Sequence, residues 1–144
     1  MPKITAPLLE SKLSHLPLLH RGKVRDLYAV DGDRLLIVTT DRISAFDVIL
    51  PTAIPDKGRV LTAISHFWFD RTRTIVPNHL TDDQSLTDII PDRDERGLLE
   101  GRSLIVKRLK ALPIEAVVRG YLIGTGYKDY LATGAVCGIA LPED

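Results

Sequence analysis

The sequence predicts an α+β fold built from short strands and one packed helix. The segment Arg34–Thr40 is a short apolar, β-branched run bounded by turn residues, which indicates a central strand. From Gly58 to Arg71, apolar residues recur every three or four positions, which predicts a helix whose apolar and aromatic stripe faces the core. The run 102–121 predicts two further strands, with Pro113 fixing the entry to the second.

Shorter elements complete the expected fold. Residues 18–30 predict a pair of strands that is broken at Gly22. Residues 75–80 predict a short edge strand, and residues 127–133 predict a short helix after a glycine-rich turn. Residues 81–101 are rich in charged residues, so we expect a solvated excursion there.

The composition of the 144-residue chain narrows the classes of function. Lys plus Arg number 19 and Asp plus Glu number 19, so no overall positive field favours nucleic acid as a partner. No apolar run approaches the roughly 20 residues that span a bilayer, and no secretory signal is visible, so we expect a soluble protein without a membrane partner. The single Cys137 fits a reducing cytoplasm, and the scattered histidines predict no metal site.

The two predicted strands of the 102–121 run look core-forming, yet each carries a cation. If both segments are extended, Lys107 and Arg108 point to opposite faces, whereas Glu115 and Arg119 share one. A cation inside apolar β structure is costly unless an anion meets it, so Lys107 and Arg119 indicate a cleft for phosphate or carboxylate. The alternative is that both side chains reach solvent from edge strands, and the residues alone leave this choice open.

The segment Gly22–Arg25 suits a lid over a polyphosphate. Gly22 lets backbone amides approach a phosphate closely, and Lys23 and Arg25 point the same way from an extended chain. The segment matches neither the Walker pattern nor the dinucleotide fingerprint, and an ordinary surface turn is the alternative.

Polar residues also gather directly after the predicted central strand. Asp41, Ser44 and Asp47 recur every three residues, at a strand end where ligand-binding loops are common. The same spacing fits a helical turn with Asp41 as its N-cap, which is the structural alternative. Later in the chain, the Thr125 hydroxyl follows Arg119 in a glycine-rich stretch that could hold an anion.

With these residues laid out, the chain resembles the phosphoribosylaminoimidazole-succinocarboxamide synthase family, the SAICAR synthetases of purine biosynthesis. The resemblance covers nearly the whole chain and rests on five blocks in the family's order: Gly22–Tyr28, Thr40–Val48, Ile54–Gly58, Val106–Leu109 and Pro113–Tyr121. Family members are longer, so the chain resembles their N-terminal portion.

The resemblance implies an architecture like the small lobe of a protein kinase. Residues 1–110 would form an antiparallel-sheet small lobe that binds nucleotide. A hinge near residues 110–114 would meet adenine, and residues 111–144 would hold this hinge and the start of a second, α/β lobe that binds substrate.

The resemblance also implies a reaction. An ATP-dependent ligase using Mg²⁺ would join L-aspartate to the carboxylate of a phosphoribosyl aminoimidazole, giving SAICAR, ADP and phosphate. A carboxylate is a poor electrophile, so the γ-phosphoryl group would first move onto it and the aspartate amine would then displace phosphate. The alternative is a truncated, noncatalytic ATP-binding module that needs a separate second half. Apolar surface intended for that half would favour self-association.

Site residues follow from the resemblance by motif, although none is identified as catalytic. The expected nucleotide-binding residues are Gly22, Lys23, Val24, Arg25, Lys107 and Glu115. The expected substrate-binding residues are Asp41, Ser44, Asp47, Arg119 and Thr125. Thr125 stands where the family usually has serine, which keeps the hydroxyl and adds a methyl group. The carboxylates expected to hold Mg²⁺ are not among these residues.

Overall fold

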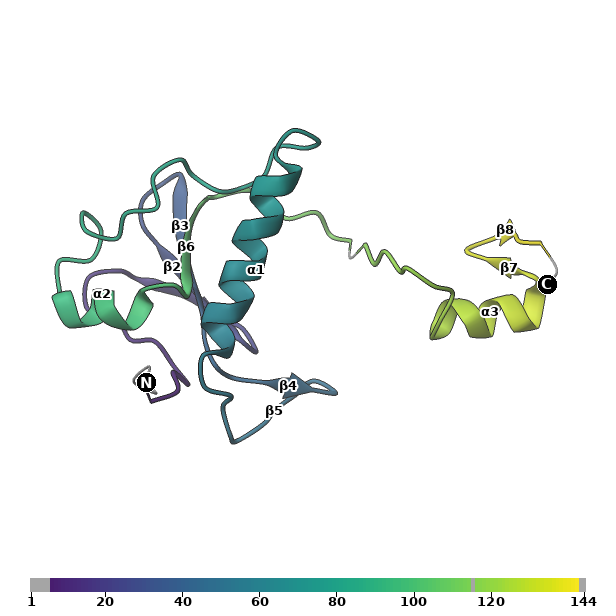
Figure 1. The fold of residues 1–144 in the computed structure, drawn as a ribbon, viewed down its shortest axis with the longest axis horizontal. Coiled ribbons are helices and arrows are strands. Elements are labelled where there is room, and N and C mark those ends of the chain that lie inside the picture. The colour runs from purple at the N-terminus through teal and green to yellow at the C-terminus, as the bar shows by residue number, and fades with distance from the viewer. Residues whose placement is uncertain (1–5, 115, 143–144) are drawn as a thin grey trace. The chain divides into compact units, whose positions relative to one another are not determined.

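The computed structural model describes residues 6–114 and 116–142 (Figure 1). The chain divides into two compact units, the first ending at Leu109 and the second beginning at Lys110. Within the first unit, an antiparallel sheet is combined with helices, which confirms the predicted α+β class. Glu115, one of the expected nucleotide-binding residues, lies outside the described residues.

A four-stranded antiparallel sheet forms the centre of the first unit. Its strands lie in the order β1 (Leu18–Arg21), β2 (Arg25–Ala29), β3 (Arg34–Thr39) and β6 (Ser103–Lys107). The predicted central strand is β3, which pairs with β2 on one side and β6 on the other. The sequence pattern therefore placed the two most apolar strands correctly.

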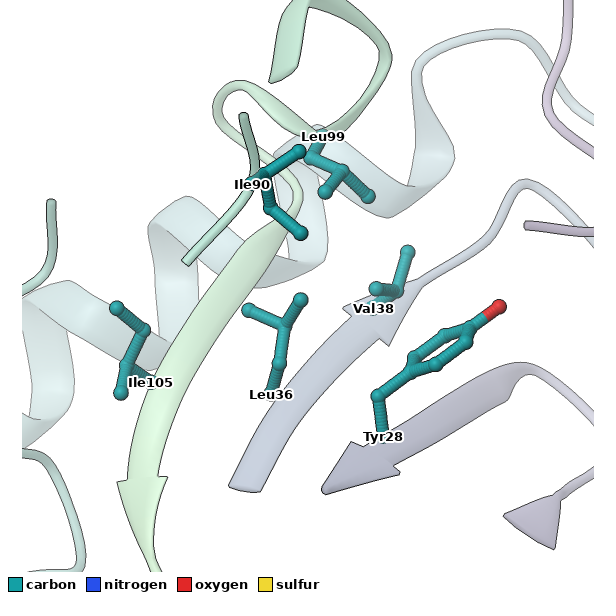
Figure 2. Close-up of a cluster of buried hydrophobic side chains, with 6 residues drawn as sticks. All are labelled: Tyr28, Leu36, Val38, Ile90, Leu99 and Ile105. Carbon is teal, nitrogen blue, oxygen red and sulfur yellow. The ribbon is translucent and has the colours of Figure 1, made fainter. Parts of the chain in front are cut away.

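One face of this sheet carries the apolar core (Figure 2). Side chains from β2, β3 and β6 meet two residues of the 81–101 segment, and the buried cluster is Tyr28, Leu36, Val38, Ile90, Leu99 and Ile105. The prediction of a solvated excursion over residues 81–101 is therefore wrong. Helix α2 (Arg93–Leu99) begins at Asp92, whose side chain accepts a hydrogen bond of 2.8 Å from Glu95 N, and its last residue enters the core.

Helix α1 (Lys57–Thr72) confirms the predicted helix but not the predicted orientation. Most of the expected core stripe is exposed, with Phe67 at 53% and Trp68 at 57%, and only Leu61 of its apolar residues is half-buried. A second stripe at the same helical spacing is the buried or half-buried one: Gly58, Thr62, Ser65, Phe69 and Thr72. Small residues let the helix approach the sheet closely, because a Cβ at Gly58 would lie only 2.2 Å from Thr39 O.

Two predicted strands are wrong. Residues 75–80 meet β6 only at an isolated bridge between Leu80 and Val106, and the rest of the segment is irregular. Around Pro113, the described residues up to 121 form no strand, and Val118 is 97% exposed. β-Branched residues such as Val118 favour a strand only when a neighbouring strand offers backbone groups to pair with. Arg119 does not lie in a strand, so strand alternation no longer supports the prediction that it shares a face with Glu115.

A small hairpin replaces the helical turn considered for residues 41–47. Strands β4 (Ser44–Ala45) and β5 (Val48–Ile49) pair antiparallel across Phe46 and Asp47. Both turn residues have positive φ, 48° and 66°, as a two-residue hairpin of type I′ requires.

The second unit contains helix α3 (Thr125–Thr133) followed by the short strands β7 (Ala135–Val136) and β8 (Ile139–Ala140). The predicted helix over 127–133 is confirmed and starts two residues earlier. Gly134 ends it in the left-handed conformation, and its N–H bonds to Tyr130 O at 2.8 Å. Among the described residues, no helix has both the length and the apolar character that crossing a membrane needs.

Candidate functional site

The segment predicted to cover polyphosphate is the tip of the β1–β2 hairpin. Arg21 pairs with Asp26, and the Gly22 amide donates to Arg25 O at 2.8 Å, which leaves Lys23 and Val24 at the turn. The Lys23 side chain is 56% exposed. The hairpin therefore presents a cation and a short run of backbone at its end.

The structure brings one expected substrate-binding residue to this tip. The Lys23 ammonium forms an ion pair with Asp47, which sits on the turn between β4 and β5. This ammonium holds the pKa of Asp47 below its ordinary value. Ser44 lies half-buried in β4, beside the same turn.

Asp41 is fully buried and serves to position other segments. Its carboxylate pairs with Arg102 Nη1 at 2.9 Å and accepts the amides of Gly58 and Leu8, both at 2.8 Å. Burial alone would raise the pKa of Asp41, but Arg102 and the two amides outweigh it and hold the pKa below its ordinary value. The carboxylate caps the start of α1, where Asp56 makes no side-chain capping bond. Because Asp41 has no exposed surface, a substrate could not contact it in this structure.

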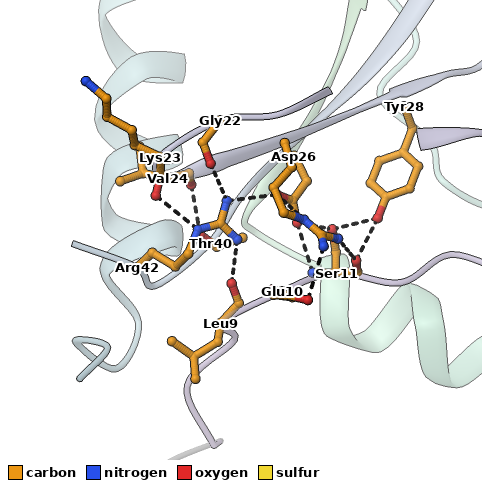
Figure 3. A network of polar contacts seen from close by, with 11 residues as sticks. Leu9, Glu10, Ser11, Gly22, Lys23, Val24, Asp26, Tyr28, Thr40 and Arg42 are labelled. Carbon is orange, nitrogen blue, oxygen red and sulfur yellow. Dashed lines mark hydrogen bonds and ion pairs between the residues drawn. The ribbon is translucent and has the colours of Figure 1, made fainter. Parts of the chain in front are cut away.

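A second buried ion pair, between Asp26 and Arg42, supports the hairpin tip (Figure 3). Arg42 Nη2 lies 2.8 Å from Asp26 Oδ1, and Ser11 donates its amide and hydroxyl to the other carboxylate oxygen. Burial would raise the pKa of Asp26, but the bonds from Arg42 and Ser11 lower it below the ordinary value. Sequence reasoning missed this pair. The available signal was a carboxylate at a core-facing position of β2, two residues before the buried Tyr28.

Two basic side chains, one at the start of α1 and one beyond its end, have lowered pKa values. Burial lowers the pKa of Lys57, and the nearby charge of Arg25 lowers it further. Burial and Arg25 also lower the pKa of His79. Sequence reasoning missed both Lys57 and His79, although Lys57 lies within one of the blocks that carry the resemblance.

Lys107 ends β6 as an exposed side chain. Its amide donates to His79 O at 2.8 Å. With Phe69, Asn78, His79 and Leu109, it lines a cavity of about 510 Å³. A mixed apolar and cationic lining suits a ligand that combines a ring with an anionic group.

Arg119 and Thr125 come together in the second unit. Both line a cavity of about 510 Å³ with Tyr121 and Val136. The Arg119 guanidinium lies against Gly124, where an added Cβ would be 3.4 Å from Nη1. Lys107 and Arg119 belong to different units, so the predicted cleft shared by both stays a prediction.

The described residues contain no all-protein metal centre. Within residues 6–114 and 116–142, no group of three His, Cys, Asp or Glu side chains is arranged to hold a metal ion. Mg²⁺ commonly binds through one or two carboxylates together with the phosphates of a nucleotide, so the expected ion would take part of its ligands from ATP.

Comparisons with known proteins identify the family of the chain. Residues 18–144 match the family model described as SAICAR synthetase. A phosphoribosylaminoimidazole-succinocarboxamide synthase of Thioalkalivibrio sulfidiphilus (strain HL-EbGR7) is 70% identical over 139 residues, which cover 96% of this chain and 47% of that protein. The chain thus spans about half the length of the curated relatives that it matches.

Solved structures show the same relationship. A protein described as SAICAR synthase matches with a TM-score of 0.84 and 43% identity, over 98% of this chain and 49% of that one. SAICAR synthase from Saccharomyces cerevisiae, described as complexed with SAICAR, matches with a TM-score of 0.81 and 44% identity, over 98% and 48% of the two chains. The hairpin tip, the buried ion pairs and the Arg119 cavity thus lie in a chain that belongs to the SAICAR synthetase family.

Proposed function

We propose that the chain supplies the nucleotide-binding lobe and part of the substrate site of an ATP-dependent ligase. The relatives are named for the synthesis of a succinocarboxamide. Their reaction, carried to this chain, joins L-aspartate to the carboxylate of a phosphoribosyl aminoimidazole and yields ADP and phosphate. The second lobe and the metal ligands would come from polypeptide that corresponds to the rest of the relatives' length.

Exposed cations of the first unit carry the proposal. Lys23 is 56% exposed at the hairpin tip, and Arg25 is exposed at the start of β2. Lys107 lines the mixed cavity together with Phe69 and His79. Cations favour an anionic ligand, and a nucleoside triphosphate combines such an anion with a ring that suits the mixed cavity. Gly22, Val24 and Glu115 stay in the proposed nucleotide site on the resemblance.

The phosphoribosyl group belongs in the second unit under this proposal. A guanidinium and a hydroxyl that line one cavity, as Arg119 and Thr125 do, suit a phosphate monoester. Ser44 and Asp47 would line the reacting end, near the Lys23 ammonium that faces Asp47. The cations would stabilise negative charge that develops as the phosphoryl group moves to the substrate carboxylate.

Isothermal titration calorimetry of the chain with ATP tests the nucleotide site. Lys107→Ala should weaken ATP binding, whereas Arg108→Ala is the matched control. Arg108 is adjacent in sequence, and its amide bonds to Asp33 O at 2.7 Å, away from the cavity residues. Equal affinities in Lys107→Ala and the unsubstituted chain would refute the role of Lys107.

The phosphoribosyl substrate is tested separately. Arg119→Ala should weaken binding of the phosphoribosyl aminoimidazole carboxylate and leave ATP binding unchanged. Lys128→Ala removes a cation from α3 that does not line the cavity and serves as the control. If both variants bind this substrate like the unsubstituted chain, the assignment of Arg119 is wrong.

A noncatalytic nucleotide-binding module is the second candidate function. The observation behind it is that the described residues contain no group of three side chains that could hold a metal ion. A product assay with ATP, Mg²⁺ and both substrates decides between the two. ATP binding without SAICAR formation supports the module, and turnover supports the ligase.

A further inference from the structure

We propose that Arg42 is a positioning residue for the tip of the β1–β2 hairpin. Together with Thr40, it holds three consecutive backbone carbonyl groups inward, so that the amide groups of Lys23 and Val24 face outward to receive a phosphate. The identity of the ligand rests on the function proposed above, whereas the positioning itself rests on the contacts in Figure 3.

Every carbonyl from residue 22 to residue 24 is bound by the segment that follows β3. Arg42 Nη2 donates to Gly22 O at 2.8 Å, and Arg42 Nε donates to Lys23 O at 3.0 Å. Val24 O accepts two bonds from Thr40, one from its amide at 3.0 Å and one from its hydroxyl at 2.9 Å. The tip is therefore fixed by four directed bonds.

The inward carbonyls determine where the amides point. In a trans peptide unit, the C=O and the N–H that follows it point in opposite directions. With Gly22 O and Lys23 O turned toward Arg42, the N–H groups of Lys23 and Val24 turn away from it. Among the described residues, neither amide donates a hydrogen bond. Successive free backbone N–H groups next to an ammonium form an anion-binding concavity of the kind that phosphates occupy.

Arg42 is itself held rigidly, which makes it suitable for this task. Its side chain is 5% exposed and pairs with Asp26 at 2.8 Å. The same guanidinium donates through Nη1 to Leu9 O, in the arm before β1. Arginine can serve these acceptors because its donors lie in a fixed planar fork, a geometry that lysine lacks.

The arm before β1 completes the support. Ser11 bonds to Asp26 through both its amide, at 3.0 Å, and its hydroxyl, at 2.7 Å. These arm residues precede the stretch 18–144 that matches the family model. The hairpin tip therefore depends on arm residues that precede the stretch covered by the family model.

Arg42→Lys separates positioning from simple stabilisation, because lysine keeps the charge opposite Asp26 and loses the fork. Arg102→Lys is the matched control. It alters the other buried ion pair, Arg102–Asp41, whose arginine is 3% exposed and donates to none of the three tip carbonyls. Thr40→Val is a second, milder variant that removes only the hydroxyl bond to Val24 O.

The experiment is an NMR titration of the complete chain with ATP, observing backbone amides, with circular dichroism as the check on folding. We expect the Lys23 and Val24 amide signals to shift on binding. Arg42→Lys should weaken ATP binding about tenfold, the scale of one charge-assisted hydrogen bond, and Thr40→Val should weaken it less. Arg102→Lys should stay within about twofold of the unsubstituted chain.

Three results would overturn the proposal. The first is ATP binding without shifts at Lys23 and Val24, and the second is equal weakening by Arg42→Lys and Arg102→Lys. The third is unchanged hydrogen exchange of the Gly22 amide, which donates to Arg25 O at 2.8 Å and so reports on the order of the tip.

This exchange measurement needs no ATP binding. A chain that binds no ATP would count against the proposed nucleotide site, and the positioning role of Arg42 would still be tested. Faster exchange in Arg42→Lys but not in Arg102→Lys upholds the positioning role, and unchanged exchange in both refutes it.

Discussion

Gly58→Ala is expected to destabilise the protein, although helix propensity alone predicts the opposite. Alanine in a helix is favoured over glycine by about 1 kcal/mol. In this structure, however, the added Cβ would lie 2.2 Å from Thr39 O and 3.0 Å from Arg102 Nη1. Thr39 O belongs to the backbone of the central strand β3 and has little freedom to move.

The distances set the size of the effect. Ordinary contact begins at 3.4 Å, so the start of α1 would have to retreat by about 1.2 Å. That movement would break the 2.8 Å bond from the Gly58 amide to the buried Asp41 carboxylate. Overpacking costs about 1–3 kcal/mol and a hydrogen bond to a charged group about 1.5–3 kcal/mol, against about 1 kcal/mol gained from propensity. We expect a net loss of roughly 2–5 kcal/mol.

Thermal unfolding followed by circular dichroism measures this loss. At about 4 °C per kcal/mol for a unit of this size, Tm should fall by roughly 8–20 °C. Gly97→Ala in α2 is the matched control, because nothing lies within 4 Å of its added Cβ. Its Tm should stay equal or rise by a few degrees. A Tm for Gly58→Ala at or above that of the unsubstituted chain would refute the close approach of α1 to β3.

Two further predictions concern charge. The pKa values of Asp26 and Asp41 are lowered in the folded chain, so their stabilisation is present above the unfolded value of about 3.9 and is lost as pH falls through the folded values. Asp26→Asn should lower the free energy of unfolding in urea by about 3–5 kcal/mol at neutral pH, and by progressively less below about pH 4. A loss of the same size at every pH would contradict this reasoning. Asp47→Asn should free Lys23 and tighten ATP binding by up to about fivefold at low salt. The gain in ATP affinity should vanish at high salt, where exposed charges are screened. Calorimetry at a low and a high salt concentration measures both affinities.

Strong local patterns in the sequence predicted the elements well. β3 is a continuous β-branched run, and α1 keeps one helical period over its whole length, so both could be located without tertiary information. Periodicity states which residues share a face, but not which face meets the sheet. In α1, the stripe that contains Gly58 and Thr62 faces the sheet, and the larger apolar stripe does not, because the small residues allow closer packing against β3.

Long-range pairing was the part that local patterns could not supply. The residues around Val118 have strand propensity, but the described structure gives them no neighbouring strand. Conversely, Ile90 and Leu99 lie in a charged stretch and still reach the core. Each outcome depends on residues far away in the chain.

Within the candidate site, the residues that present charge to solvent were easier to predict than those that hold them. Lys23 and Arg25 stand out because cations beside a glycine suggest phosphate. Arg42 and Asp26 look like ordinary surface charges in the sequence, and only the fold shows that they are buried against each other. A buried ion pair becomes visible from sequence only when the strand alternation assigns one partner to the core.

The exposed side of α1 gives the protein a built-in optical probe. Trp68 is the single tryptophan of the chain, is 57% exposed, and makes an edge-to-face contact with Phe67 at 5.3 Å between ring centroids. Its emission should resemble that of an indole in water and be quenched readily by iodide or acrylamide. Any second copy or partner that covers this helix would shift the emission to shorter wavelength and protect it from quenching. Assembly on this face can therefore be followed without adding a label.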